Sequence, residues 1–153
     1  MVLIKLQLDG NETIDEVDDY SQGHITIEGK NGIISSKRSS INQSMMIFVA
    51  AIELLDGYRI FINNKHEGIY NFVGCDSSFT FYLIRQSKES KIIVENSDEE
   101  IIDELEQLEL AKCILESSKV FFNTYVKPKD NWEFAKNDLA NAMKDFAGYF
   151  GLD

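Results

Sequence analysis

Apolar residues are concentrated in one long run, Ser44 to Asn63 (SMMIFVAAIELLDGYRIFIN). The polar positions that interrupt it recur at intervals of three, three and four residues, and they are Glu53, Asp56, Arg59 and Asn63. This spacing places them on one narrow stripe of a helix and leaves its other sides apolar. We therefore predict a central helix that the rest of the chain covers, with a structural Asp56–Arg59 ion pair on its polar stripe.

The length of this run decides between the alternatives for it. A short run rich in Ile, Val and Phe can also be a buried strand, and Gly57 opposes a helix by about 1 kcal/mol relative to Ala. A run of roughly 20 residues is nevertheless too long for an ordinary strand. The uncharged part, 43–52, is too short for the ~20 residues that cross a bilayer, so we expect no membrane span.

Alternating apolar and polar residues predict three strands before the central helix. Val2 to Leu8 alternates strictly, and Gly23 to Glu28 and Ile33 to Ser36 flank the sequence Gly29-Lys30-Asn31-Gly32. Asn-Gly is a strong hairpin signal because both residues tolerate positive φ. We expect a loop over the acidic segment 11–22 and a solvated connection over 35–40.

Three further strands are predicted after the central helix, at Ile69 to Val73, Phe79 to Arg85 and Lys91 to Glu95. Short polar turns separate them, and such tight connections imply antiparallel neighbours rather than crossovers.

Two helices are predicted at the C-terminal end. The sequence Ser97-Asp98-Glu99-Glu100 matches a capping box, and apolar residues recur at threes and fours from Ile101 to Tyr125. Asp130 is the expected cap of the last helix, in which Trp132 begins an apolar stripe that ends at Phe150.

The predicted order is therefore βββα-βββ-αα. We expect an α+β fold in which an antiparallel sheet, made of two three-stranded units, packs against the central helix and two C-terminal helices. The 153 residues suit a single globular domain that spans 1–153.

The charge of the chain is its clearest functional signal. The formal net charge is −11, which repels nucleic acid and anionic membranes and attracts basic proteins. Solubility alone is the simpler explanation of this charge. The carboxylates are concentrated in 9–19 and 98–109, and we expect those in the second segment to lie on the outer face of the predicted helix. The candidate partner-binding residues are Asp15, Glu16, Asp18, Asp19, Asp98, Glu99, Asp103 and Glu106.

Motifs for catalysis and cofactor binding are missing from the sequence. It contains no GxxxxGK[ST], GxGxxG, GxSxG or HExxH pattern. The histidines, His24 and His66, are too scattered for a closed metal site, so we expect no metal and no cofactor. Cys75 and Cys113 lack CxxC partners and suit free thiols. The start of the sequence, 1–10, alternates too strictly and turns polar too soon for a signal peptide, so we expect a cytoplasmic protein.

The turn Gly74 to Ser78 combines a thiol, a carboxylate and two hydroxyls, but no base accompanies them in the sequence. We expect an ordinary turn in which Asp76 bonds to its own backbone. A catalytic role would require a deep pocket in which Asp76 meets Asp56 or Glu53.

These observations lead to an expected function and two alternatives. We expect a non-enzymatic cytoplasmic binding protein whose acidic surface holds a basic protein, for example an immunity or antitoxin-type inhibitor of a nuclease toxin. The first alternative is a small enzyme that uses carboxylates near Asp76. The second is a structural domain that forms a homodimer through the central helix or the last helix.

Overall fold

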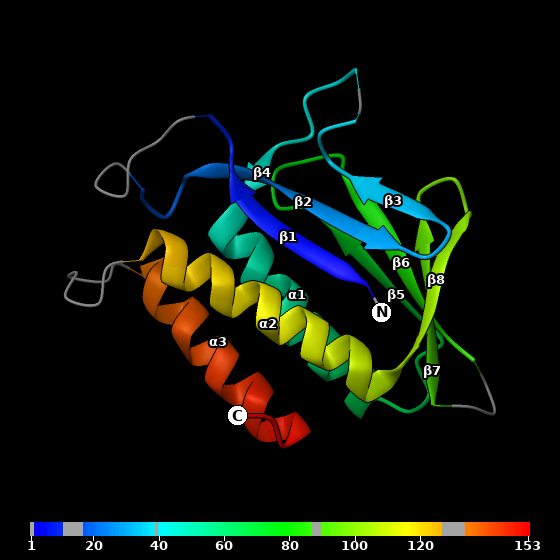
Figure 1. Cartoon of the computed structure of the whole chain (residues 1–153). Coiled ribbons are helices and arrows are strands. Elements are labelled where there is room, and N and C mark those ends of the chain that lie inside the picture. The colour runs from blue at the N-terminus through cyan, green and yellow to red at the C-terminus, as the bar shows by residue number, and fades with distance from the viewer. Residues whose placement is uncertain (1, 11–16, 39, 87–89, 127–133) are drawn as a thin grey trace.

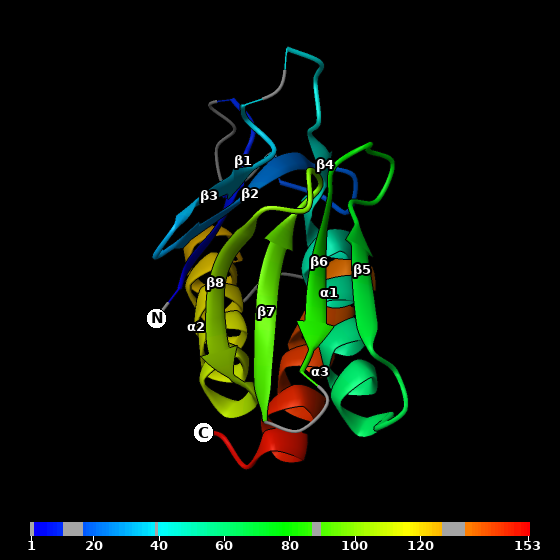
Figure 2. The ribbon, with the colours of Figure 1, turned by 90° about the vertical axis from the view of Figure 1, so that its right-hand side faces the viewer.

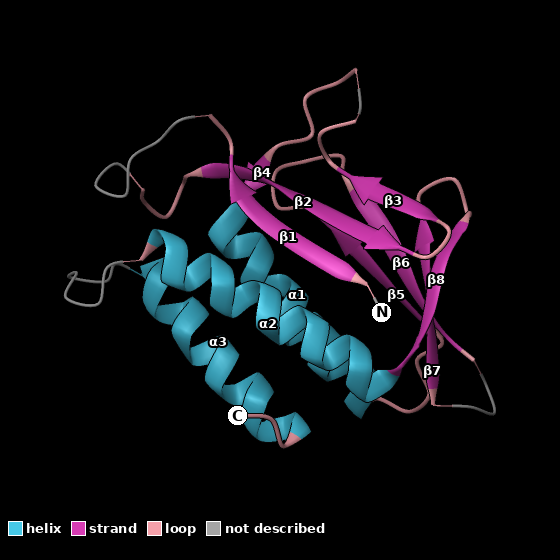
Figure 3. Cartoon of the chain, viewed as in Figure 1, coloured by secondary structure: helices cyan, strands magenta, loops and turns pink. Residues whose placement is uncertain are grey.

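The computed structural model describes residues 2–10, 17–38, 40–86, 90–126 and 134–153. The strands are β1 (Leu3–Leu8), β2 (Gln22–Gly29), β3 (Gly32–Ser35), β4 (Met45–Met46), β5 (Ile69–Val73), β6 (Thr80–Arg85), β7 (Lys91–Asn96) and β8 (Ile101–Glu106). The helices are α1 (Ile47–Asn63), α2 (Gln107–Tyr125) and α3 (Phe134–Phe150). The α+β fold with antiparallel sheets is confirmed, and Figure 3 shows the strands gathered on one side and the helices on the other.

The first sheet has the strand order β1-β2-β3, and the short β4 also pairs with β2. Its pairs are antiparallel, with Leu6 opposite Ile25 and Ile27 opposite Ile34. The predicted hairpin joins β2 to β3, with Gly29 opposite Gly32. Alternate residues of β1 are buried, so this sheet presents one apolar face to the helices.

The central helix is confirmed as α1, which begins at Ile47 and ends at Asn63. It begins three residues later than the apolar run because Met45 and Met46 pair with β2. Eight of its residues are buried, and Tyr58 among them is fully buried. Asp56 and Arg59 form the predicted ion pair, with 3.6 Å between the carboxylate oxygen and the guanidinium nitrogen.

The second sheet is a four-stranded meander, β5-β6-β7-β8, and its last strand corrects the sequence prediction. Residues 101–106 form β8, and the helix predicted from the capping box begins only at Gln107. The Asn96 side chain accepts hydrogen bonds from the backbone amides of Asp98 (3.0 Å) and Glu100 (2.9 Å), and these bonds make a turn between β7 and β8.

A β-bulge explains why β8 resembles a helix in sequence. Glu95 pairs with Ile101, whereas Val94 pairs with Asp103, so Ile102 is the extra residue. The bulge turns Ile102 and Asp103 inward together, with Leu105 following. The apolar positions 102 and 105 are therefore three apart, which is the spacing of a helix face.

The helices form layers behind the sheets. Helices α1 and α2 pack against the strands, and α3 packs on α1 and α2 (Figure 1). The ring of Tyr58 lies 6.2 Å from that of Phe146 and 5.7 Å from that of Phe150. The expected cap Asp130 and the residue Trp132 lie outside the described residues. At the described start of α3, the Asp19 carboxylate accepts a hydrogen bond from the Ala135 amide at 3.0 Å.

Candidate protein-binding face

The second sheet has one face that no described element covers. Phe72, Phe81, Leu83, Ile92 and Val94 point toward the helices and are buried. The alternate residues point to the other side, which faces the viewer in Figure 2 with the helices behind it. We call this side the outer face, and its members are Ile69, Asn71, Val73, Thr80, Tyr82, Ile84, Lys91, Ile93, Glu95, Ile101, Glu104 and Glu106.

The outer face is unusually apolar for a sheet surface open to solvent. Strand pairing places Ile69 opposite Ile84, and Ile84 opposite Ile93, so one apolar row crosses three strands. Ile69 is 57% exposed, Val73 48% and Ile101 51%. Antiparallel sheets usually present polar side chains on their wet face. Clustered exposed apolar side chains of this kind mark interaction sites.

Carboxylates border this apolar row on the side of β7 and β8. Glu95, Glu104 and Glu106 belong to the outer face, and the exposed Asp98, Glu99 and Glu100 lie in the adjoining turn. Lys91 is the one cation that the described strands place on the outer face, 4.0 Å from Glu104. The Arg85 guanidinium instead donates to the Asn64 backbone carbonyl (3.3 Å) and lies over the Phe61 ring.

The structure divides the carboxylates predicted to bind a partner. Asp98 and Glu99 lie in the β7–β8 turn beside the outer face, and Glu106, on the outer face, ends β8 directly before α2, so none of the three lies on a helix face. The predicted helical face was therefore wrong, because 101–106 is a strand. Asp103 is also not on the surface, because it is 7% exposed and accepts a hydrogen bond from the Lys30 amide at 2.9 Å.

The described carboxylates near the N-terminus, Asp18 and Asp19, are separate from the outer face. Asp19 caps α3 as described above, and the Asp18 carboxylate accepts from the Tyr20 amide at 2.9 Å. Asp15 and Glu16 lie outside the described residues. The outward isoleucines were not predicted from the sequence, although one signal for them was present: Ile84 and Ile93 occupy positions that alternate with buried ones.

The turn that carries Cys75 and Asp76 does not have the geometry of a catalytic site. Burial raises the pKa of the Cys75 thiol, and the nearby Glu53 and Asp76 carboxylates raise it further. A nucleophilic cysteine needs the opposite shift, because the thiolate is the reactive form. Neither of the two large cavities described below is lined by Asp76, Asp56 or Glu53.

A polar cavity of about 540 Å³ contains a serine, a histidine and an aspartate that lie far apart in sequence. His24 Nδ1 lies 2.8 Å from Ser36 Oγ, and its Nε2 lies 3.5 Å from Asp9 Oδ1. Ser36 is only 2% exposed, and its Oγ accepts a hydrogen bond from the Ile25 amide at 3.1 Å. A catalytic serine must reach its substrate, so this cluster links strands instead of supplying a nucleophile.

Within the described residues, no three His, Cys, Asp or Glu side chains gather as metal ligands would. In the same part of the chain, no helix has both the length and the apolar character needed to cross a membrane. Comparison of the chain with protein-family models, curated proteins and solved structures finds no significant match.

Proposed function

We propose that this chain is a non-enzymatic binding protein that holds a basic protein partner on the outer face of its second sheet. The observation that carries the proposal is the apolar row Ile69, Ile84 and Ile93 beside a border of carboxylates; Ile69 is exposed, and Ile84 and Ile93 are half-buried. Protein interfaces combine an apolar centre with a polar rim in the same way. The apolar centre supplies affinity, and the charged rim selects the partner and its orientation.

The charge of the chain supports a cationic partner. The described turn and strands around β7 and β8 carry Glu95, Asp98, Glu99, Glu100, Glu104 and Glu106 against Lys91. A net charge of −11 adds a long-range field of the same sign, which speeds the encounter with a basic protein. A nuclease toxin has a basic substrate-binding site, so a cytoplasmic immunity or antitoxin-type inhibitor is the most concrete form of this proposal.

The homodimer alternative receives less support than a partner protein does. In this alternative, a homodimer forms through the central helix or the last helix. The apolar sides of these helices, α1 and α3, are buried within the chain. The outer face is an apolar surface that a second copy could use. The like charge of two such faces opposes their pairing.

Two variants with the same change in charge test the proposal. Glu95→Lys with Glu104→Lys reverses two carboxylates of the outer face, whereas Asp138→Lys with Asp145→Lys reverses two exposed carboxylates on α3. Immobilised wild-type protein is first used to capture partners from a lysate of the source cells at low and at high salt. Affinities of each captured, purified protein for the three chains are then measured.

The proposal predicts a basic partner whose affinity falls about tenfold or more with the outer-face variant and much less with the α3 variant. An equal loss of affinity in both variants would show that the partner is attracted by net charge alone, and this would overturn the proposed site. The absence of any salt-sensitive basic partner would overturn the proposed function. Sedimentation of the purified chain adds a further check. If the wild-type chain forms a dimer and the outer-face variant is a monomer, the outer face binds a second copy, and the proposed basic partner is contradicted.

A further inference from the structure

The outer edge of β1 carries backbone groups that no described residue pairs. In the first sheet β1 lies at the edge and pairs with β2 alone. The Asp9 amide donates to the Gln22 carbonyl at 2.9 Å, which makes Asp9 and Gln22 a hydrogen-bonded pair of the ladder. Such pairs alternate in an antiparallel sheet, so Leu3, Lys5 and Gln7 also point their amides toward β2. The N–H and C=O groups of Ile4 and Leu6 therefore point away from the sheet.

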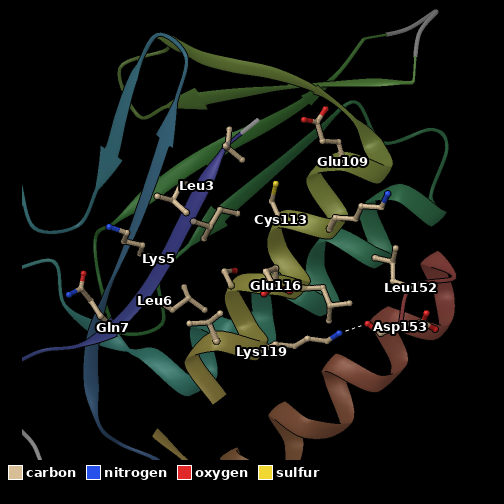
Figure 4. Close-up of a pocket in the computed structure, with 16 residues that line it drawn as sticks. Leu3, Lys5, Leu6, Gln7, Glu109, Cys113, Glu116, Lys119, Leu152 and Asp153 are labelled. Atoms are coloured by element: carbon tan, nitrogen blue, oxygen red, sulfur yellow. Dashed lines mark hydrogen bonds between the residues drawn. The ribbon is translucent and has the colours of Figure 1, made fainter. Parts of the chain in front are cut away.

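This edge borders an apolar groove of about 750 Å³. Figure 4 shows β1 on one side of the groove, α2 along its floor and the C-terminal residues on the far side. The Val2 amide is hydrogen-bonded to the Cys113 thiol of α2, so the outer edge of β1 faces this helix. Leu3 and Val120 stand at the mouth and are 51% and 56% exposed.

The charges in the groove are balanced, in contrast to those of the outer face. Glu109, Glu116 and Asp153 contribute carboxylates, and Lys5, Lys112 and Lys119 contribute ammonium groups. Lys119 Nζ donates to a backbone oxygen of Asp153, which ties the C-terminal residue to α2. The groove therefore does not select its occupant by net charge.

The backbone edge selects the occupant instead. Successive outward amides of a strand are two residues apart, roughly 6.8 Å, which is the repeat of another extended chain. An acyl chain laid in the groove would cover the Ile4 and Leu6 amides and carbonyls without bonding to them, which would leave these polar groups buried and unpaired. An extended peptide satisfies the same groups and places alternate side chains on the apolar wall.

We propose that this groove binds an extended, uncharged segment of a partner protein, which adds to the first sheet as a strand beside β1. Alternate side chains of the segment are apolar and pack on α2 near Cys113 and Val120. The site is distinct from the outer face and does not depend on the function proposed for it. Binding at the groove can therefore fail while the outer face still holds its partner, and the reverse also holds.

Amide hydrogen exchange followed by NMR tests whether the edge of β1 is unpaired in the free protein. The Lys5 and Gln7 amides are expected to exchange slowly because they donate to β2. The Ile4 and Leu6 amides are expected to exchange at least about tenfold faster because they lack a partner. Equal protection of all four amides in the free chain would overturn the proposal. Protection of Ile4 and Leu6 that disappears on dilution would do so too, because it would show a second copy of the chain on this edge.

Three probes then identify the occupant. The first is a ten-residue peptide of alternating Val and Thr with a solubilising Lys at each end, used at up to about 1 mM. The second is the same peptide N-methylated at alternate residues on the edge that would face β1, and the third is palmitate. The proposal predicts that the unmodified peptide alone slows exchange at Ile4 and Leu6 about tenfold and slows alkylation of Cys113 in a Cys75→Ser background. The proposal would be overturned by any of three results: the unmodified peptide has no effect, the methylated peptide binds equally well, or palmitate alone protects Cys113.

A pair of helix variants tests whether the peptide binds in the groove. Val120→Asp puts a carboxylate at the mouth of the groove. Ile60→Asp puts one at a position on α1 that is also 56% exposed. The first is expected to weaken the peptide effect about tenfold and the second to leave it unchanged. Because both positions are exposed, both variants should fold, which their unchanged amide spectra would verify. An equal response to the two variants would contradict binding in the groove.

Discussion

The Asp103 carboxylate accepts a hydrogen bond from the backbone amide of Lys30 at 2.9 Å, and this contact joins β8 to the β2–β3 turn. The neighbouring Asn31 amide donates to the Ile102 carbonyl, also at 2.9 Å. The β2–β3 turn packs closely against β8, and a Cβ added at Gly29 would lie only 2.7 Å from Ile102 Cγ2. A carboxylate that the sequence suggested for partner binding therefore holds the two sheets together.

Removing the Asp103 carboxylate is expected to destabilise the fold. Asp103→Ala leaves the partly buried Lys30 amide without its acceptor, which costs about 1–3 kcal/mol. Urea unfolding measures the change. Asp98→Ala, at an exposed position of the adjoining turn, should change the free energy of unfolding by less than about 0.5 kcal/mol. Equal effects of the two substitutions would contradict the structural role of Asp103.

Gly57 in α1 is expected to resist replacement by alanine. Alanine normally stabilises a helix by about 1 kcal/mol relative to glycine. Here the added Cβ would lie 2.1 Å from the Tyr70 hydroxyl and 2.6 Å from its ring carbon Cζ. We expect Gly57→Ala to lower the free energy of unfolding by about 1–3 kcal/mol.

A second glycine within a helix, Gly148 in the last turn of α3, provides the control for this experiment. A Cβ at Gly148 in α3 meets nothing within 4 Å, so Gly148→Ala should stabilise the protein by about 0.5–1 kcal/mol. Thermal unfolding measured by circular dichroism compares the two variants. A gain from Gly57→Ala as large as that from Gly148→Ala would show that Tyr70 does not occupy this position.

The buried phenol of Tyr58 is expected to make the fold sensitive to alkaline pH. Its hydroxyl donates to the Gln107 carbonyl at 2.8 Å, and burial raises its pKa well above the ordinary value, against a smaller lowering by Arg85. In the unfolded chain a tyrosine ionises at about pH 10. The stability that this group contributes is therefore complete below about pH 10 and is lost as the pH rises above it.

Tyr58→Phe tests this linkage directly. The substitution should cost about 0.5–1.5 kcal/mol at neutral pH because the hydrogen bond to Gln107 is lost. It should also reduce the fall in stability between about pH 10 and 12, because one group that resists ionisation in the fold is gone. Urea unfolding at several pH values gives both quantities. An unchanged pH dependence in the variant would exclude Tyr58 as a source of the alkaline sensitivity.

Ser36→Ala is expected to affect stability and not chemistry. The substitution removes the acceptor of the Ile25 amide and the partner of His24 Nδ1, at a cost of about 1–3 kcal/mol. Ser78→Ala, at an exposed turn position, should be nearly neutral. Chemical denaturation compares the two variants. Hydrolysis of an activated ester that is lost in Ser36→Ala, with the fold intact, would instead assign a catalytic role to this cluster.

Periodicity in the sequence was sufficient to predict the elements whose side chains follow a regular repeat. The central helix was recognisable because its polar residues form one stripe, and β1 because its residues alternate. The sequence of β8 predicts the start of a helix because the bulge at Ile102 breaks the two-residue repeat of a strand. The pairing of Val94 with Asp103, which makes that bulge, is a tertiary contact that no local pattern reveals.

The sequence by itself determined the charge of −11, the α+β class and the buried central helix, because composition and local repeats depend only on the order of residues. Tertiary structure decided which carboxylates face solvent, placing Asp103 inside and Asp98 and Glu106 outside. It also left the row from Ile69 to Ile93 uncovered and the edge of β1 unpaired. Strand order and register decide these features, and both arise from contacts between residues far apart in the chain.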